Sequence, residues 1–160
     1  MPLLLAILFA VAPSVSQTSW MRPDAFHLTI GMAKPDAVKA LSSGGLTLRD
    51  GDHAGQLVAD ITPTKSITIE FAKDRLQSVR FELFTMSDVM GAAFEEEKRF
   101  LRDSFGAPKP IASKSVASKS MVIYDATLPN VMAVVTTDVK QGLSTLAVRY
   151  FDPATASRRH

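Results

Sequence analysis

The segment Asp50–His53 carries the residue types that come closest to a metal site in this chain. Alternating carboxylates around a glycine begin many calcium-binding loops, and an imidazole adds a ligand that suits transition metals. A calcium loop also needs further acids at fixed offsets and a closing glutamate, and Ala54–Leu57 supplies none of them. Asp-Gly is a favoured pair in tight hairpin turns. We therefore interpret the segment as a hairpin turn, and we predict neither a metal site nor a cofactor.

Histidines and carboxylates elsewhere do not form a recognisable catalytic pattern. His27, His53 and His160 are scattered, and the Gly-x-Ser-x-Gly elbow that often presents a nucleophilic serine is missing. The consecutive acids Glu95–Glu97 fall in an expected amphipathic helix, where a solvated acidic face is the ordinary role. The sequence identifies no catalytic residue and favours a protein that is not an enzyme.

Three lysines in a Ser-rich stretch, Lys109, Lys114 and Lys119, are candidates for contact with an anionic lipid, polysaccharide or nucleic acid. The alternative is a solvated loop. Each lysine contributes at most about 1 kcal/mol at an anionic membrane surface, which is too little to anchor the chain. The net charge is only +2, and no basic stripe with interleaved aromatic residues is present. The sequence thus predicts no nucleic-acid partner.

Alternating polar and apolar residues predict the strands that present a binding surface. The two clearest runs are 66–71 and 76–84, joined by a turn at 72–75, and a third run covers 143–151. The side chains expected on the helix-covered face are Ile67, Ile69, Phe71, Val79, Phe81, Leu83, Leu146, Val148 and Tyr150. Those expected on the opposite face are Thr68, Glu70, Arg80, Glu82, Thr145, Arg149 and Phe151.

Four residues of that opposite face, Arg80, Glu82, Arg149 and Phe151, are the candidate protein-binding residues, because arginines and aromatic rings dominate protein interfaces. A further stretch, 131–135, is apolar on both faces of its strand. Such a strand is normally covered twice. Either the chain itself covers it, or another protein or a second copy of the chain does.

Helices are expected at two places. Pro35 and Asp36 suit the first turn of a short helix that ends at 42–45, where Gly44 and Gly45 follow two serines. A longer amphipathic helix is expected over 88–104. Shorter strands are expected at 45–48, 56–61, 121–126 and 131–137. The run 26–30 is expected to be a short strand or an extended lead-in.

The order of these elements predicts an α+β fold with short helices packed on one face of an antiparallel sheet. We expect a single domain over 26–153, made of two tandem helix-plus-meander halves at 26–86 and 87–153. A flexible lead over 17–25 precedes the domain, and a polar tail over 154–160 follows it. Whether the halves share one sheet is left open.

The first sixteen residues predict export. The apolar run 3–11 suits a signal peptide and is shorter than the ~20 residues of a membrane-spanning helix. Pro13 follows, and Ser14 and Ser16 place small residues where a signal peptidase reads them, so we expect cleavage between Ser16 and Gln17. No basic residue precedes the apolar run, and the alternative is a buried N-terminal helix of a cytosolic protein. The prediction is a periplasmic or secreted protein without a membrane span.

Cysteine is absent from the chain. The sequence therefore contains no disulfide, thiol nucleophile, zinc-thiolate site or lipidated cysteine. The fold must be stabilised by its apolar core alone, which a chain of this length can bury.

Two segments resemble a family of small exported modules. Gly31–Val38, with Leu41, resembles the Gly-Met-(Ser/Thr)-x-x-Glu-Val-x-x-Leu opening of the SmpA/OmlA outer-membrane assembly modules and of the beta-lactamase inhibitory protein family. Ser104–Pro108, followed by Val122–Tyr124, resembles their Gly-x-Pro…Tyr passage between helix and strand. The resemblance implies helices on a small antiparallel sheet and binding to other proteins. The chain departs from both groups in lacking the cysteines of their lipid anchor or disulfides.

The sequence thus favours an exported, non-catalytic protein-binding or envelope-assembly module whose partner is another protein or a second copy of itself. One alternative is a small-ligand carrier or minor hydrolase that uses a pocket between helix and sheet. A third is a structural domain.

Overall fold

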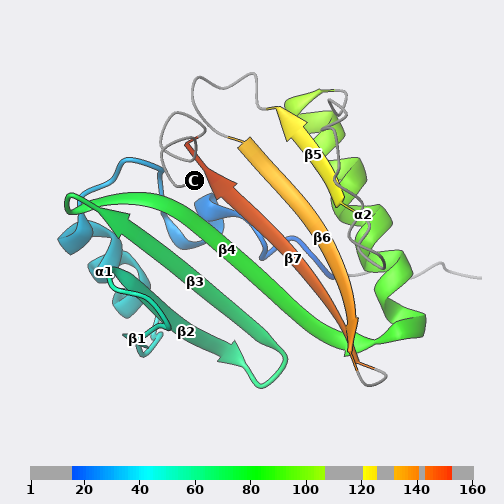
Figure 1. Cartoon of the computed structure of the whole chain (residues 1–160), viewed down its shortest axis with the longest axis horizontal. Coiled ribbons are helices and arrows are strands. Elements are labelled where there is room, and N and C mark those ends of the chain that lie inside the picture. The colour runs from blue at the N-terminus through cyan, green and yellow to red at the C-terminus, as the bar shows by residue number, and fades with distance from the viewer. Residues whose placement is uncertain (1–15, 107–120, 126–131, 141–142, 153–160) are drawn as a thin grey trace, which may run out of the picture.

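A seven-stranded antiparallel sheet forms the centre of the molecule (Figure 1). The computed structural model describes residues 16–106, 121–125, 132–140 and 143–152. In chain order the elements are the 3-10 helix η1 (Pro23–Phe26), α1 (Lys34–Ser43), β1 (Arg49–Asp50), β2 (Gln56–Thr62), β3 (Lys65–Ala72), β4 (Arg75–Met86), α2 (Ser87–Phe105), β5 (Met121–Asp125), β6 (Met132–Lys140) and β7 (Leu143–Phe151). The predicted α+β class is therefore confirmed.

The strands lie in the order β1-β2-β3-β4-β7-β6-β5, and every neighbouring pair is antiparallel. The two meanders meet at the centre, where β4 pairs with β7 along its length, with Arg80 opposite Arg149. All the strands of residues 49–151 that the structure describes thus belong to one sheet, which answers the question that the sequence leaves open.

The hairpin between β3 and β4 forms where the sequence predicts it. Lys73 and Asp74 at its tip have φ angles of 50° and 56°. Two successive residues with positive φ match the twist of a hairpin, because they turn the chain in the sense of the right-handed twist of the strands. The turn fixes the register of the strands that carry most of the polar face.

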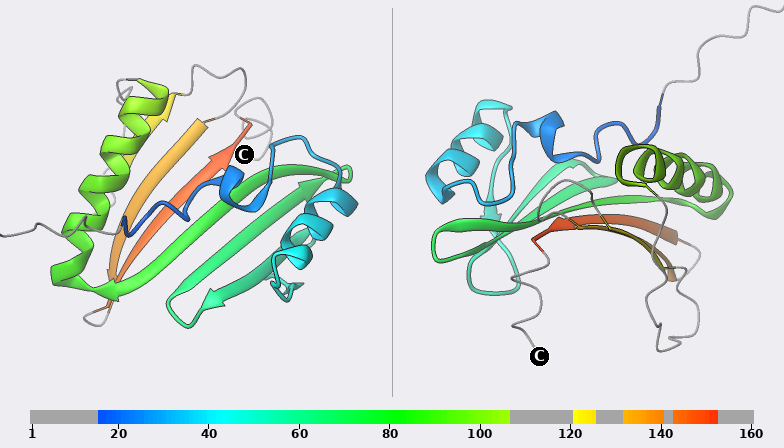
Figure 2. Two further views of the ribbon diagram at one scale, coloured as in Figure 1. Left: turned by 180° about the vertical axis from the view of Figure 1, so that it is seen from behind. Right: turned by 90° about the horizontal axis from the view of Figure 1, so that it is seen from above.

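The helices lie on one face of the sheet, as expected (Figure 2). The nine apolar side chains expected on this face are all buried. They form one core with Leu41 of α1 and with Met90 and Leu101 of α2. At its centre Phe81 is completely buried and contacts the rings of Phe26 and Tyr150.

The N-terminal lead also belongs to this core. Thr18 and Met21 are 0% exposed, and the Trp20 ring meets the Phe81 ring edge-on at 6.0 Å. The residues 17–25, which the sequence predicts as a lead, pack through these apolar side chains between the two helices (Figure 2).

Two of the short strands that the sequence allows do not form at the expected positions. The residues 26–30 form no strand; η1 ends there, and His27 adopts a left-handed conformation with φ of 56°. The strand expected at 45–48 is instead β1, two residues long, at Arg49–Asp50.

The segment Asp50–His53 is a turn between β1 and β2, which confirms its interpretation. The Gly51 amide donates a hydrogen bond to the Gln56 carbonyl at 2.9 Å, and the Asp52 amide donates to the Gln56 Oε1 atom at 2.9 Å. Gly55 then passes close to β3, where an added Cβ would lie 2.8 Å from the Phe71 carbonyl oxygen. Only glycine fits there without a shift of the backbone.

Some expectations fall outside the described residues. They concern the apolar run 3–11, the lysines Lys109, Lys114 and Lys119, the tail 154–160, and the side chains of 131–135. Within the part of the chain that the structure covers, no helix has the length and hydrophobicity to cross a membrane.

Candidate functional site

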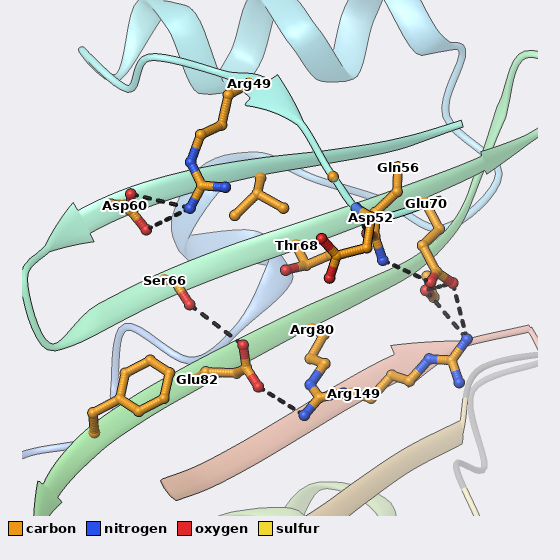
Figure 3. A pocket seen from close by; sticks show the side chains of 14 residues that line it. Arg49, Asp52, Gln56, Asp60, Ser66, Thr68, Glu70, Arg80, Glu82 and Arg149 are labelled. Atoms are coloured by element: carbon orange, nitrogen blue, oxygen red, sulfur yellow. Dashed lines mark hydrogen bonds and ion pairs between the residues drawn. The ribbon is translucent and has the colours of Figure 1, made fainter. Parts of the chain in front are cut away.

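The face of the sheet opposite the helices is hollowed into a polar groove of about 420 Å³ (Figure 3). We call it the sheet groove. Its lining residues come from β1 to β4, from β7 and from the β1–β2 turn: Arg49, Gly51, Asp52, Gln56, Val58, Asp60, Ser66, Thr68, Glu70, Ser78, Arg80, Glu82, Phe84 and Arg149.

Strand register sets the floor of the groove in three rows, because residues paired across strands share a face. The central row is Val58, Thr68, Arg80 and Arg149. A second row places Glu70 between Gln56 and Ser78, and a third row is Asp60, Ser66, Glu82 and Ala147. The period of two along each strand thus gathers polar side chains from regions about 90 residues apart in the sequence.

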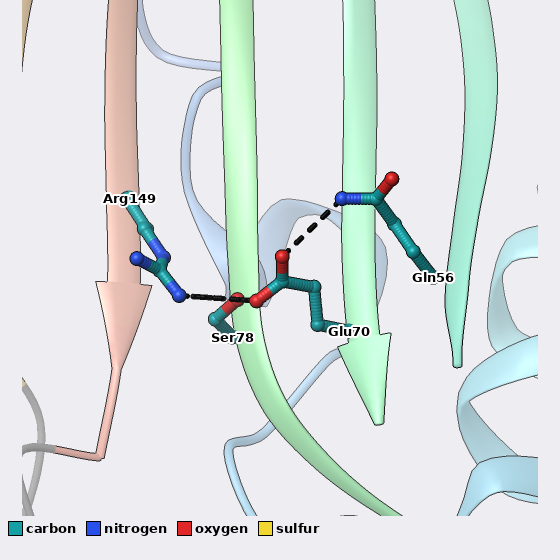
Figure 4. A network of polar contacts seen from close by, with 4 residues as sticks. All are labelled: Gln56, Glu70, Ser78 and Arg149. Atoms are coloured by element: carbon teal, nitrogen blue, oxygen red, sulfur yellow. Dashed lines mark hydrogen bonds and ion pairs between the residues drawn. The ribbon is translucent and has the colours of Figure 1, made fainter. Parts of the chain in front are cut away.

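Glu70 is the centre of one hydrogen-bonded cluster (Figure 4). Its Oε2 atom accepts hydrogen bonds from the Ser78 hydroxyl at 2.8 Å and from an Arg149 Nη atom at 3.0 Å. Its Oε1 atom accepts a hydrogen bond from the Gln56 amide nitrogen at 3.2 Å. Since Ser78 is nearly buried, this cluster holds the Glu70 carboxylate in one place on the floor.

Glu82 is the centre of a second cluster. Its carboxylate pairs with Arg80 at 2.7 Å and accepts a long hydrogen bond from the Ser66 hydroxyl at 3.5 Å. At the β1–β2 side of the groove, Arg49 pairs with Asp60 at 3.2 Å. Each arginine of the groove is therefore paired with a carboxylate.

These ion pairs are only partly shielded from water. The arginine side chains are between 45% and 59% exposed. Ion pairs of this kind contribute about 0–1 kcal/mol to stability. The sheet positions these arginines, and each of them has a carboxylate partner.

Asp52 stands apart from these pairs. It lines the groove with its carboxylate turned inward (Figure 3), and among the described residues no cation pairs with it. The groove has three arginines and four carboxylates, a net charge of −1, whereas the whole chain carries +2. The groove is therefore acidic, and its carboxylate without an ion-pair partner among the described residues belongs to the exposed Asp52.

The structure brings together three of the four candidate binding residues. Arg80, Glu82 and Arg149 line the groove. Phe151 lies beside it, with the Arg149 guanidinium 5.1 Å from its ring centre. Sequence reasoning missed Asp52, whose chemistry was considered only as a metal ligand.

It also missed the contribution of β2, from which Gln56 and Asp60 reach the groove. The polar–apolar alternation of β2 is weak, because Val58 lines the polar face and Ile61 is only partly buried. The signal that was available is the Asp-Gly turn, which requires β2 to return alongside β1.

A buried carboxyl group lies on the other face of the sheet. Glu97 of α2 is 0% exposed, and neither of its oxygens accepts a hydrogen bond of normal geometry from a described residue. Burial raises its pKa to about 7, although the Thr18 hydroxyl and the Arg22 charge oppose the shift. Burial, together with the Glu97 charge, also raises the pKa of Tyr150.

The histidines in the described part of the chain do not complete a site. His27 ends η1 and His53 lies in the β1–β2 turn, and neither lines the sheet groove. Across the residues that the structure covers, no three histidines or carboxylates are grouped as metal ligands.

Comparisons with known proteins return no match: no family model, no curated protein and no solved structure is similar to this chain.

Proposed function

We propose that this chain is an exported, non-catalytic module that binds another protein through the sheet groove. The observation that carries the proposal is the groove itself: pre-positioned arginines and carboxylates on the open face of a sheet whose other face holds the core. The signal pattern of residues 1–16 supports export. The resemblance to exported assembly and inhibitor modules points the same way.

The occupant that we propose is a loop of a folded partner that brings a lysine or arginine to Asp52. Charge complementarity favours such a loop, since the groove is acidic and its own arginines are already paired. A second copy of the chain would oppose one groove of charge −1 to another. A different protein with a basic loop is therefore a more favourable partner than a second copy.

Aromatic rings at the two ends of the groove extend the surface. Phe84 is 37% exposed, and Phe151 pairs with Ser78 at the opposite end of the polar rows. A stable protein interface buries about 800 Å² on each side, which is more than the groove alone supplies. We propose that both rings contact the partner and supply the apolar area that charge pairs lack.

A carrier or hydrolase would use a pocket between helix and sheet, and among the described residues the packing over β4 does not favour one. Side chains of the lead and η1, including Trp20, Met21 and Phe26, occupy that space and pack on Phe81. The open face is the better-supported site.

Site-specific photo-cross-linking tests the proposal in the cells that make the protein. Photoreactive phenylalanine analogues replace Phe84, which lines the groove, or Arg99, which is exposed on α2. We expect a cross-link to one defined protein from position 84 and none to that protein from position 99. The Asp52→Arg substitution, placed in the position-84 variant, should abolish the cross-link.

Three outcomes would overturn the proposal. They are equal cross-links from both positions, a cross-link only to a second copy, and a cross-link only to the tail 154–160 of the same chain. Peptide mapping by mass spectrometry separates them. Export is tested independently, because a protein that retains Met1 and stays in the cytoplasm would refute it.

A further inference from the structure

The N-terminal end of the lead makes several contacts with a single carboxylate on α2. Glu96 accepts hydrogen bonds from the Ser16 hydroxyl, from the Gln17 amide at 3.3 Å, and from the Thr18 amide and hydroxyl at 3.4 and 3.1 Å. These contacts join residues that are 78 to 80 positions apart in the sequence. Glu96 is thus the docking point for the start of the folded chain.

Burial limits where a processed chain can begin. Thr18 is completely buried beside Glu97, and Met21 is completely buried in the core. A cut after Thr18 would remove one of these residues. The bond that fits the signal peptidase pattern, Ser16–Gln17, is the last bond but one before the first buried residue.

We propose that cleavage of the Ser16–Gln17 bond completes the contact with Glu96 and so locks the lead onto the mature fold. A signal peptidase adds water across this peptide bond, so that Ser16 leaves with a carboxylate and Gln17 retains an α-ammonium group. The Gln17 nitrogen already lies 3.3 Å from Glu96 Oε2, within ion-pairing distance. A neutral amide donor is thereby replaced by a positively charged donor, which makes a stronger hydrogen bond to a carboxylate.

The electrostatics of Glu96 support this pairing. Burial by itself raises its pKa, but the hydrogen bonds from Ser16, Gln17 and Thr18 together outweigh burial and hold the pKa below 4.5. Glu96 is consequently an anion at neutral pH. Cleavage removes the Ser16 hydroxyl from this carboxylate, and the new ammonium group compensates for the loss.

Cleavage in the cell rests on the proposed export. The ion pair itself does not, and it is tested with purified protein. The mature chain, residues 17–160, is compared with a form whose terminus is blocked by glutaminyl cyclase. This enzyme closes the α-amine of Gln17 onto its side-chain amide and releases ammonia, which leaves an uncharged lactam. Intact mass confirms each form.

Urea unfolding then gives the folding equilibrium constant of both forms in the unsubstituted protein and in the Glu96→Gln variant. We expect blocking to lower this constant about 3- to 5-fold in the unsubstituted protein, as for a partly exposed ion pair, and to leave it unchanged in Glu96→Gln. Glu95→Gln is the matched control, because Glu95 is exposed on the same helix and pairs with Lys98. It should retain the full effect of blocking.

Equal effects of blocking in the unsubstituted protein and in Glu96→Gln would refute the ion pair. A mature protein that retains Met1 in the cell would refute the cleavage, even where the purified chain shows the coupling. Neither result bears on binding at the sheet groove, which the cross-link from position 84 tests separately.

Discussion

Glu97 makes the stability of the protein depend on pH. Its carboxyl group is buried between α2 and the sheet, and its pKa of about 7 is well above the ordinary value of 4.5. Between about pH 4.5 and about pH 7 the folded protein therefore retains a proton on Glu97 that the unfolded chain has released. Stability consequently decreases as the pH rises from about 4.5 to about 7. At 1.36 kcal/mol per pKa unit, the total loss is roughly 3 kcal/mol.

We expect Glu97→Gln to remove this pH dependence. Near pH 4.5 the neutral amide and the protonated acid are equivalent, so the variant and the unsubstituted protein should be similarly stable. At pH 8 the variant should be more stable by up to roughly 3 kcal/mol, because no charge is buried. Urea unfolding at both pH values measures the difference. A variant that is less stable than the unsubstituted protein at pH 8 would show that Arg22 stabilises the Glu97 anion.

A second residue-level prediction concerns the Glu70 cluster. Glu70→Gln removes the negative charge and one of the two acceptor oxygens of the carboxylate that holds Arg149 and Ser78 on the groove floor. Because the pair is partly exposed, the free energy of unfolding should fall by only about 1 kcal/mol. Partner binding should weaken more than stability, since Arg149 loses its position. Calorimetry measures the affinity of the variant for the protein identified by cross-linking, and urea unfolding measures its stability. Together the two measurements separate the effects.

Among the elements, those with strong periodicity were predictable from the sequence. β3 and β4 alternate with a period of two over many residues, and α2 has a long apolar stripe with a polar face, so their positions agree with the structure within a few residues. β1 has two residues and therefore no period. The lead has no period either; its burial depends on Phe81, which only the folded sheet places beneath Trp20.

The candidate site was predictable in part for the same reason. Arg80, Glu82 and Arg149 lie on strongly alternating strands, so their common face follows from the sequence. Asp52 and Gln56 lie in and after a turn, where the direction of a side chain depends on tertiary structure.

The β3–β4 turn makes a prediction at this scale. Asp74 has a φ of 56°, a conformation that costs a non-glycine residue roughly 1 kcal/mol. Asp74→Gly should therefore raise the free energy of unfolding by up to about 1 kcal/mol, because glycine adopts this φ without strain. Ala72→Gly, which replaces the last residue of β3, should lower it instead. Opposite signs in urea unfolding confirm the turn conformation, and a loss of stability in both variants contradicts it.

At the scale of the whole molecule, the two faces of the sheet have different tasks. One face is covered by the helices and the lead and supplies the stability of a chain without disulfides. The other face presents fixed charges and is free of this structural role. Substitutions in the sheet groove should therefore alter binding with little effect on folding, whereas core substitutions such as Phe81→Ala should cost about 3–5 kcal/mol of stability.

The most direct test of the sheet groove is the affinity of the chain for the protein cross-linked at position 84. Isothermal titration calorimetry compares the unsubstituted chain, Asp52→Arg, and the control Asp36→Arg, which makes the same charge change on exposed α1. We predict that Asp52→Arg weakens binding by about 10-fold or more, while Asp36→Arg leaves it unchanged. Equal affinities for all three proteins would contradict the account.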